Sequence, residues 1–297
     1  MDSQKKKIII IIFSVLILTS LFGATLYYDS YFTAPSRFQV RYEILRSMFI
    51  PDQMDDVKIL FFSDLDYGTF MDEKRMDKLC SRINELRPDI ILFGGDLIDQ
   101  SSPTLNEATA VMLCEKLYNL QAPLGKFAVL GDFDCRSPEE TELIRQVLFE
   151  SEFELLENRS IILRNNGNES ITLTGVDNGM NGVPDITSAF ANVSRASYNI
   201  VLCHTPDMAE YMPVDLTDYM LSGHSHGGQA YWGIGALYTP GMAEIYFRGK
   251  HLIDDLYTLD ISNGTGTTIE DVRFLSNAEI VLYRLKHIGV YDPDTLQ

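Results

Sequence analysis

The stretch Leu221–Gln229 reads L-S-G-H-S-H-G-G-Q and places His224 and His226 one residue apart between glycines. The apolar residues just before it, Y-M-L-S at 219–222, indicate a buried strand that ends at these histidines. Two imidazoles at the end of a strand can hold a metal ion if other strands bring further ligands to the same edge of the sheet. The binding capacity of this segment therefore depends on how the other strands end.

Four other apolar runs lead into carboxylate or imidazole side chains. The runs 57–62, 89–93, 126–130 and 199–202 are followed by Asp64 and Asp66, by Asp96, by Asp132 and by His204, respectively. Apolar residues recur at helical spacing over 76–86 and 108–120, and S-P-E-E at 137–140 is typical of the start of a third helix. Because ligands of open α/β sheets lie beyond the carboxyl ends of the strands, we expect these side chains to converge.

The order of these elements predicts an α/β fold. A βαβαβα half comes first, followed by a half that we expect to be mostly antiparallel and that begins with a hairpin at 159–175. The two halves would form a two-sheet sandwich flanked by helices. We expect four parts along the chain: a lysine stretch and membrane anchor at 1–28, a juxtamembrane linker at 29–56, the α/β domain at 57–288 and a tail at 289–297.

The N-terminal segment is typical of a membrane anchor. Three lysines at 5–7 precede the uncharged run 8–26, whose length is close to the ~20 residues that a helix needs to cross a bilayer. An uncleaved signal anchor is the favoured interpretation, and a cleaved signal peptide is the alternative. The lysines favour a single-pass protein of the cell membrane whose domain lies outside the cytoplasm, although Arg37, Arg41 and Arg46 weaken that charge asymmetry.

The composition excludes one class of partner. The formal net charge of −18 argues against nucleic acid, because phosphate backbones are bound by basic patches. The four cysteines show no C-x-x-C spacing, so neither a zinc knuckle nor a disulfide framework is indicated. A cluster of divalent cations would instead neutralise several of the carboxylates.

The strand ends supply more ligands than one ion can take. Two cations about 3.5–4 Å apart that share one carboxylate would use the whole set. Mixed oxygen and nitrogen donors suit Mn²⁺, Fe or Zn²⁺ better than Ca²⁺ or Mg²⁺, which prefer oxygen ligands alone, and Mn²⁺ is the favoured ion. The seven candidate metal ligands are Asp64, Asp66, Asp96, Asp132, His204, His224 and His226.

These motifs resemble the calcineurin-like metallophosphoesterase family, whose pattern is D-x-H, G-D, G-N-H-D/E, a later His and G-H-x-H. The similarity runs from about Lys58 to Leu285, and G-H-S-H-G-G-Q is its most specific part. The chain is most similar to the membrane branch, called transmembrane protein with metallophosphoesterase domain, which includes cell-wall-associated phosphoesterases and a UDP-2,3-diacylglucosamine pyrophosphatase.

The resemblance implies a dinuclear centre in which a hydroxide bridging the two metals attacks phosphorus. It assigns one metal to Asp64, Asp66, Asp96 and His226, and the other to Asp96, Asp132, His204 and His224. Asp96 would thus bridge the two ions.

Two positions depart from the family pattern. Asp66 stands where the family has a histidine, which adds charge and favours Mn²⁺ or Mg²⁺ over Zn²⁺. G-D-F-D at 131–134 replaces G-N-H-D, so Asp132 stands in for Asn and Phe133 for the histidine that stabilises charge or protonates the leaving group. Asp134 and Arg136 are candidates for the missing catalytic role, and the alternative is that Asp134 fixes the loop and Arg136 is solvated.

Two functions remain open at this point. The first is a membrane-anchored phosphohydrolase that cleaves a phosphoester or pyrophosphate bond, with lipid-linked or cell-envelope phosphates as the favoured substrates. The second is a catalytically weakened binding scaffold on the same fold, as in the retromer subunit that resembles the G-D-F-D variant. Loss of a general acid costs about 10²–10⁴-fold in rate, and it matters least for good leaving groups.

Overall fold

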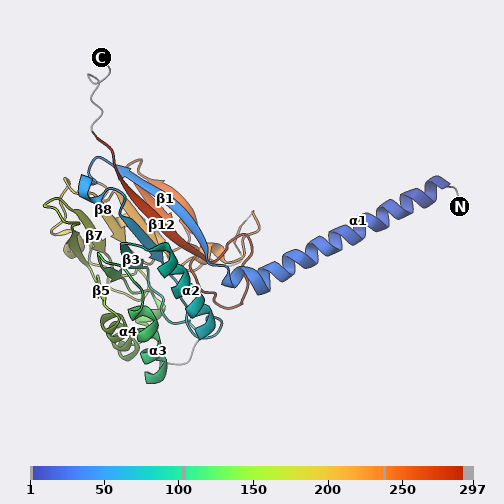
Figure 1. Ribbon diagram of the computed structural model, residues 1–297, viewed down its shortest axis with the longest axis horizontal. Helices are drawn as coiled ribbons and strands as arrows, with labels where there is room; N and C mark the ends of the chain where they lie inside the picture. The colour runs from blue at the N-terminus through green and yellow to red at the C-terminus, as the bar shows by residue number, and fades with distance from the viewer. Residues whose placement is uncertain (1–2, 102–104, 234, 237–238, 290–297) are drawn as a thin grey trace, which may run out of the picture.

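The computed structural model describes residues 3–101, 105–233, 235–236 and 239–289. Within these residues, two six-stranded sheets pack face to face, with strand orders β1-β12-β2-β3-β4-β5 and β10-β11-β9-β8-β7-β6 (Figure 1). The strands of the first sheet are β1 Gln39–Ser47, β2 Lys58–Phe62, β3 Ile90–Phe93, β4 Lys126–Ala128, β5 Phe153–Leu155 and β12 Glu279–His287. Those of the second are β6 Arg159–Leu163, β7 Ile171–Gly175, β8 Asn199–Leu202, β9 Tyr219–Ser222, β10 Gly249–Ile253 and β11 Tyr257–Ile261.

Three helices cover the outer face of the first sheet, namely α2 (Glu73–Leu86), α3 (Glu107–Tyr118) and α4 (Pro138–Glu150). The predicted start of α4 is confirmed, because the Ser137 hydroxyl accepts a hydrogen bond from the Glu140 N–H and Pro138 takes the first helical position. The carboxylate of Glu140, however, does not reach back to close a capping box, and it accepts instead from Arg136.

The central strands are apolar throughout because both of their faces are buried. In β2, Leu60 and Phe62 pack towards the helices, whereas Ile59 and Phe61 pack towards the second sheet. This period-2 alternation within a continuous apolar run is what an α/β sandwich requires. The prediction of an α/β two-sheet sandwich with flanking helices is therefore confirmed.

The prediction of a mostly antiparallel second half is wrong. β8 is parallel to both β7 and β9, and β9 is parallel to β11. Among the described strands of this sheet, only the β6–β7 and β10–β11 pairs are antiparallel. The physical reason lies in the connections. The short helix α5 (Ile186–Phe190) links β7 to β8, and the 3₁₀ turn at 206–211 links β8 to β9, so each acts as a crossover.

β1 lies inside the segment 29–56 that the sequence had suggested as a linker. It pairs in parallel with β12 along its whole length, from Gln39 opposite Glu279 to Ser47 opposite His287. The Arg41 guanidinium reaches the second sheet, where it binds both carboxylate oxygens of the buried Asp260 at 2.9 Å. The sheet therefore begins at residue 39, ahead of the expected boundary at 57.

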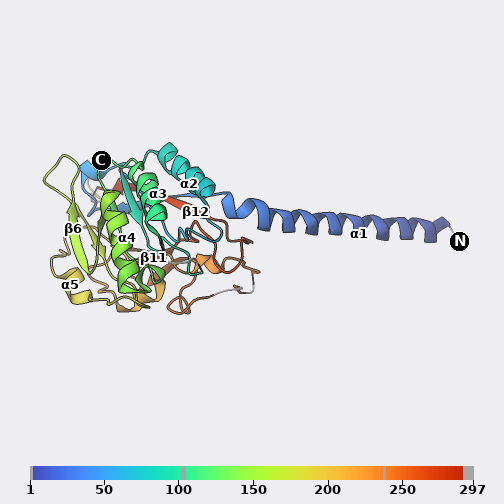
Figure 2. The ribbon, with the colours of Figure 1, turned by 90° about the horizontal axis from the view of Figure 1, so that it is seen from below.

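The N-terminal helix α1 (Ser3–Tyr28) projects away from the sandwich in both views (Figures 1 and 2). It continues as a π-helical turn at Asp29–Thr33 and a 3₁₀ turn at Ala34–Ser36. The helix is long and apolar enough to cross a bilayer, as a signal sequence would also be. The expected span 8–26 lies within it. The helix joins the domain through a hydrogen bond of 2.9 Å from the Arg273 N–H to the Ser30 carbonyl.

Candidate metal centre

The candidate ligands stand on turns that follow the strands, and the backbone of these turns is unusual. Five of the seven residues adopt a positive φ, between 49° and 69°: Asp64, Asp66, Asp96, His224 and His226. Residues other than glycine rarely adopt this backbone conformation, which costs on the order of 1–3 kcal/mol at each position. Such strain persists where the surrounding structure enforces it, as it does at functional sites.

Glycines allow these turns to approach one another. A Cβ on Gly131 would lie 2.0 Å from Oδ1 of Asp96, and one on Gly223 would lie 2.5 Å from Oδ2 of Asp64. No side chain fits at either position. The G-D and G-H motifs therefore bring the chain close to the carboxylates of neighbouring strands.

Four of the predicted residues, Asp96, Asp132, His204 and His224, form what we call the four-ligand cluster. One donor atom from each lies within 4.8 Å of the others, and all four residues are buried. Nε2 of His204 lies 3.1 Å from the Asp96 carboxylate and 3.2 Å from that of Asp132, and Nδ1 of His224 lies 2.9 Å from Asp132. Carboxylate and imidazole donors at this spacing can hold a divalent cation.

The second nitrogen of each histidine in this cluster is held by a backbone carbonyl. Nδ1 of His204 lies 2.6 Å from the Gly94 oxygen, and Nε2 of His224 lies 2.7 Å from the Gly241 oxygen. A ring N–H that donates to a carbonyl fixes the tautomer, so that the other nitrogen keeps its lone pair for a metal. Both rings are therefore oriented as metal ligands usually are.

Asp64, Asp66 and His226 form the three-ligand cluster, which is wider. Nε2 of His226 lies 3.5 Å from the Asp66 carboxylate and 3.9 Å from that of Asp64. The oxygens of Asp64 accept hydrogen bonds from the Ser63 hydroxyl and from the His224 N–H, whereas both oxygens of Asp66 accept none.

Unpartnered buried atoms concentrate at these two clusters. Among the described residues, ten buried side-chain nitrogen and oxygen atoms make no hydrogen bond, and six of them belong to Asp66, Asp96, Asp132, His204 and His224. A buried polar atom without a partner costs about 1–3 kcal/mol. Cations bound between these atoms would satisfy them, so the residues fit a metal centre.

The charge of the site also favours cations. Burial raises the pKa of Asp96 to about 7 and raises that of Asp66, where the charges of Asp64 and Asp96 add to the effect. Burial lowers the pKa of His226 to about 4, which leaves its imidazole neutral. Closely spaced carboxylates thus need positive charge to remain ionised together.

Comparison with known proteins agrees with this geometry. The family model described as calcineurin-like phosphoesterase matches residues 57–228. The chain belongs to this family. It is 28% identical over 257 residues to the uncharacterized metallophosphoesterase YkuE of Bacillus subtilis, covering 85% of this chain and 87% of that one.

This calcineurin-like phosphoesterase is also similar to proteins from a second bacterium and from a vertebrate. An uncharacterized metallophosphoesterase of Aquifex aeolicus is 27% identical over 275 residues, covering 91% of this chain and 98% of its own. The transmembrane protein with metallophosphoesterase domain of Danio rerio is 24% identical over 262 residues, which are 80% of this chain but 55% of that protein.

Arg273 also belongs to this phosphoesterase site, although no sequence motif pointed to it. Its side chain is buried beside the three-ligand cluster, where it donates to the carbonyl oxygens of His226 at 2.9 Å, Asn263 at 2.6 Å and Gly266. Its guanidinium also lies 3.4 Å from Nδ1 of His226. Burial lowers the pKa of Arg273 to about 10, so it stays charged at neutral pH. The sequence feature that could have indicated its burial is that it is the one charged residue in the otherwise apolar stretch V-R-F-L at 272–275.

The structure gives Asp134 and Arg136 other partners than a substrate. The buried Asp134 carboxylate accepts the N–H groups of Asp96, Leu97 and Gly131 at 2.8–2.9 Å. Arg136 donates to the carbonyls of Asp99 and Gln100 and to the Glu140 carboxylate. These contacts favour a loop-fixing role for Asp134, as the alternative interpretation had it. Arg136 is held by protein groups, so the expectation that it is solvated is not met.

Phe133 occupies the place of the family histidine. Its N–H donates to Oδ1 of Asp96 at 3.0 Å, while its half-buried ring offers no group that exchanges a proton. The backbone of this position therefore still supports the site, although its side chain cannot act as an acid.

Proposed function

We propose that this calcineurin-like phosphoesterase is a membrane-anchored hydrolase of phosphoester or pyrophosphate bonds that uses two divalent metal ions. The observation that carries the proposal is that seven buried residues with metal-binding side chains follow the ends of strands. Six oxygen and nitrogen atoms of these side chains have no hydrogen-bond partner. The family supports a metal-dependent phosphoester hydrolase. The anchor, the number of ions and the substrate are our inference.

Each cluster would hold one cation. Asp96, Asp132, His204 and His224 would bind the first, and Asp64, Asp66 and His226 the second, with Asp96 shared between them. Cations held there would supply Lewis acidity towards a phosphoryl group and activate water. The chain's own contribution is to exclude bulk water, since the seven residues are at most 3% exposed, and to fix the rings of His204 and His224.

The donor set favours hard ions and good leaving groups. Asp66 brings a carboxylate to the second position, which favours Mn²⁺ over Zn²⁺ and leaves Fe and Mg²⁺ as alternatives. Because Phe133 cannot donate a proton, the leaving oxygen must depart without help from that position. We therefore expect aryl, nucleotide or pyrophosphate leaving groups to react faster than simple alkyl ones.

A binding scaffold is the second candidate, and Phe133 is the observation that favours it. Metal content and turnover of the purified full-length chain in detergent separate the two. If the protein is a hydrolase, we expect about two bound ions per chain. We also expect it to hydrolyse at least one of three test substrates: an aryl monoester, an aryl diester and a pyrophosphate.

Asp96→Asn should abolish that turnover, because the shared carboxylate loses a charge. Asp72→Asn is a matched control, because Asp72 caps α2 and Asn caps a helix equally well. A full chain that binds no metal and turns over no substrate would contradict the hydrolase and support the scaffold.

We further propose that α1 anchors the protein in the cell membrane with the domain outside the cytoplasm. The exposed apolar helix and the lysines at 5–7 support this arrangement. A tethered active site would act on lipid-linked or cell-envelope phosphates. Removal of residues 8–26 should then leave the rate on soluble esters unchanged and lower the rate on membrane-bound ones, and equal losses on both would argue against a membrane substrate.

A further inference from the structure

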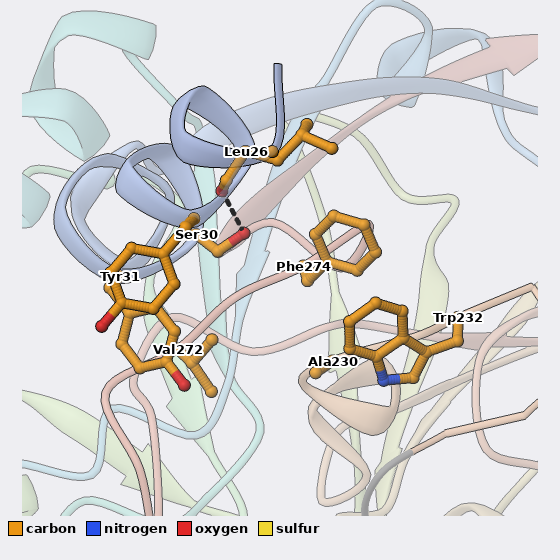
Figure 3. A pocket seen from close by; sticks show the side chains of 9 residues that line it. Leu26, Ser30, Tyr31, Ala230, Trp232, Val272 and Phe274 are labelled. Atoms are coloured by element: carbon orange, nitrogen blue, oxygen red, sulfur yellow. Dashed lines mark hydrogen bonds between the residues drawn. The ribbon is translucent and has the colours of Figure 1, made fainter. Parts of the chain in front are cut away.

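An apolar cavity of about 380 Å³ lies where α1 meets the domain (Figure 3). One wall comes from the end of the helix and includes Leu26 and Tyr31, and the facing wall includes Trp232 and Phe274 from two loops of the domain. The rings of Trp232 and Phe274 are in contact, with their centroids 4.7 Å apart and their planes tilted by 38°. The volume falls within the roughly 300–1,000 Å³ typical of ligand sites.

The lining indicates the chemistry of the occupant. Ser30 is polar, but its hydroxyl already donates to the Leu26 carbonyl at 2.8 Å (Figure 3). Most of the remaining lining is aliphatic or aromatic, from Leu26, Ala230, Trp232, Val272 and Phe274. A hydrocarbon chain suits such a surface, whereas a polar ligand would lose its hydration without finding partners.

The position of the cavity indicates where such a chain would come from. The uncharged run 8–26 ends at Leu26, so the cavity opens at the boundary between hydrocarbon and head groups if α1 spans the membrane. Tyr27, Tyr28 and Phe32 follow immediately and are more than 60% exposed, and such rings are enriched at membrane interfaces. Trp232, which lines the cavity together with Tyr27, is 62% exposed.

One short segment forms both the cavity and the metal centre. Val272 and Phe274 line the cavity, whereas the Arg273 side chain between them binds His226. The opposite cavity residue Ala230 follows His226 by four positions, which is a span of at most about 14 Å. Two segments of chain, 226–230 and 272–274, therefore connect the cavity lining directly to the surroundings of the metal ligand His226.

We infer that this cavity receives a hydrocarbon chain of a membrane lipid and that the phosphate of the same lipid is thereby presented to the metal centre. The inference rests on the proposed function and narrows its substrate to lipids whose phosphate lies next to their acyl chains. The anchor helix is then part of the substrate site, in addition to holding the enzyme at the membrane.

Gly23 offers a way to fill the cavity without disturbing the fold. It lines the cavity from α1, and a Cβ placed on it would meet no atom within 4 Å. Gly23→Phe therefore adds a ring at the cavity with no clash and removes a poor helix former. Ala24→Phe is the matched control, because it adds nearly the same bulk to the next, exposed helix position outside the lining.

The binding test uses the only tryptophan of the chain, Trp232. The full-length protein is placed in phosphatidylcholine nanodiscs that contain CDP-diacylglycerol with brominated acyl chains, which quench fluorescence at short range. Wild-type protein and Ala24→Phe should be quenched at least about twofold more than Gly23→Phe. Equal quenching in all three would overturn the inference, since Trp232 would then merely face the bilayer.

The same samples, loaded with Mn²⁺, separate this inference from the proposed function. Hydrolysis of bis(p-nitrophenyl) phosphate should be equal in the three proteins, while cleavage of the pyrophosphate bond of CDP-diacylglycerol, which has the good leaving group that the site requires, should fall at least about tenfold in Gly23→Phe alone. An unchanged rate on CDP-diacylglycerol in Gly23→Phe would overturn the link between the cavity and the substrate. If wild-type protein hydrolysed neither compound but kept its selective quenching, the proposed function would fail and the lipid site would stand.

Discussion

The two clusters of the metal centre sit side by side but are supported differently. In the four-ligand cluster, the outer nitrogens of His204 and His224 each meet a backbone carbonyl, at 2.6 and 2.7 Å. In the three-ligand cluster, the outer nitrogen of His226 faces the guanidinium of Arg273, itself a donor, at 3.4 Å. A ring that accepts a hydrogen bond there is a poorer metal ligand than a ring that donates one.

This difference indicates that the two clusters bind their cations with different affinities. The four-ligand cluster has short distances and oriented rings, whereas the three-ligand cluster compensates for a loosely placed histidine with the additional carboxylate of Asp66. We expect one tight and one weaker site. The following predictions test that asymmetry, from the largest effect to the smallest.

Removal of one histidine from each cluster should give unequal losses. His204→Ala should weaken Mn²⁺ binding at the tight site by more than about 100-fold, whereas His226→Ala should weaken the other site by about tenfold. Calorimetric titration of chelator-treated protein measures both, with His251→Ala as a control because His251 lies outside the two clusters. Equal losses of Mn²⁺ affinity in the two variants would contradict the proposed difference between the two sites.

Arg273 should affect only the weaker site. Arg273→Met removes the contact with the His226 ring and leaves several buried carbonyl oxygens without a donor, so we expect a loss of stability of about 1–3 kcal/mol. Mn²⁺ affinity at the three-ligand cluster should rise by about tenfold, because the variant removes a positive charge beside the carboxylates and the hydrogen bond that the His226 ring accepts. The affinity of the other cluster should change by less than about twofold.

Arg273→Lys keeps the positive charge and should therefore keep most of the low affinity, and a purely structural role would not explain that difference between the two variants. Calorimetric titration and thermal unfolding distinguish the two effects. A change of the same size at both sites would contradict a local role for Arg273.

Phe133→His restores the group that the family carries next to Asp96. Because the missing proton donor matters most for poor leaving groups, turnover of an alkyl phosphodiester should rise by about tenfold or more, and that of an aryl diester by much less. The ratio of the two rates is the readout, and Phe133→Leu is the control. A proportional rise on both substrates would mean that the ring of Phe133 limits access instead.

The smallest effect concerns metal choice. Asp66→His replaces a carboxylate by an imidazole in the weaker cluster, which should shift the preference by a few-fold from Mn²⁺ towards Zn²⁺. Competition between the two ions at equal concentration, followed by metal analysis, measures this shift. An unchanged ratio would show that Asp66 does not contact the ion.

The sequence identified the residues that converge but not everything that holds them. Asp96, Asp132, His204 and His224 come together as expected, because parallel strands end at one edge and their apolar runs were long enough to recognise. The parallel order of the second sheet was missed because a five-residue helix and a 3₁₀ turn give little periodic signal.

Two further features depend on contacts between distant segments. β1 is half-exposed and carries Arg41 and Glu43, so its pairing with β12 is not evident from hydrophobic alternation. Arg273 lies 47 positions from His226, and its role follows from the close approach of two loops, which no local pattern records.

The most direct test is the electron paramagnetic resonance spectrum of the full-length chain loaded with two equivalents of Mn²⁺. Two ions that share Asp96 at about 3.5–4 Å are magnetically coupled, so we predict a multiline spectrum that reverts to an uncoupled signal in Asp96→Asn. A wild-type spectrum with only the six lines of isolated Mn²⁺ would show that the clusters do not hold a pair of cations.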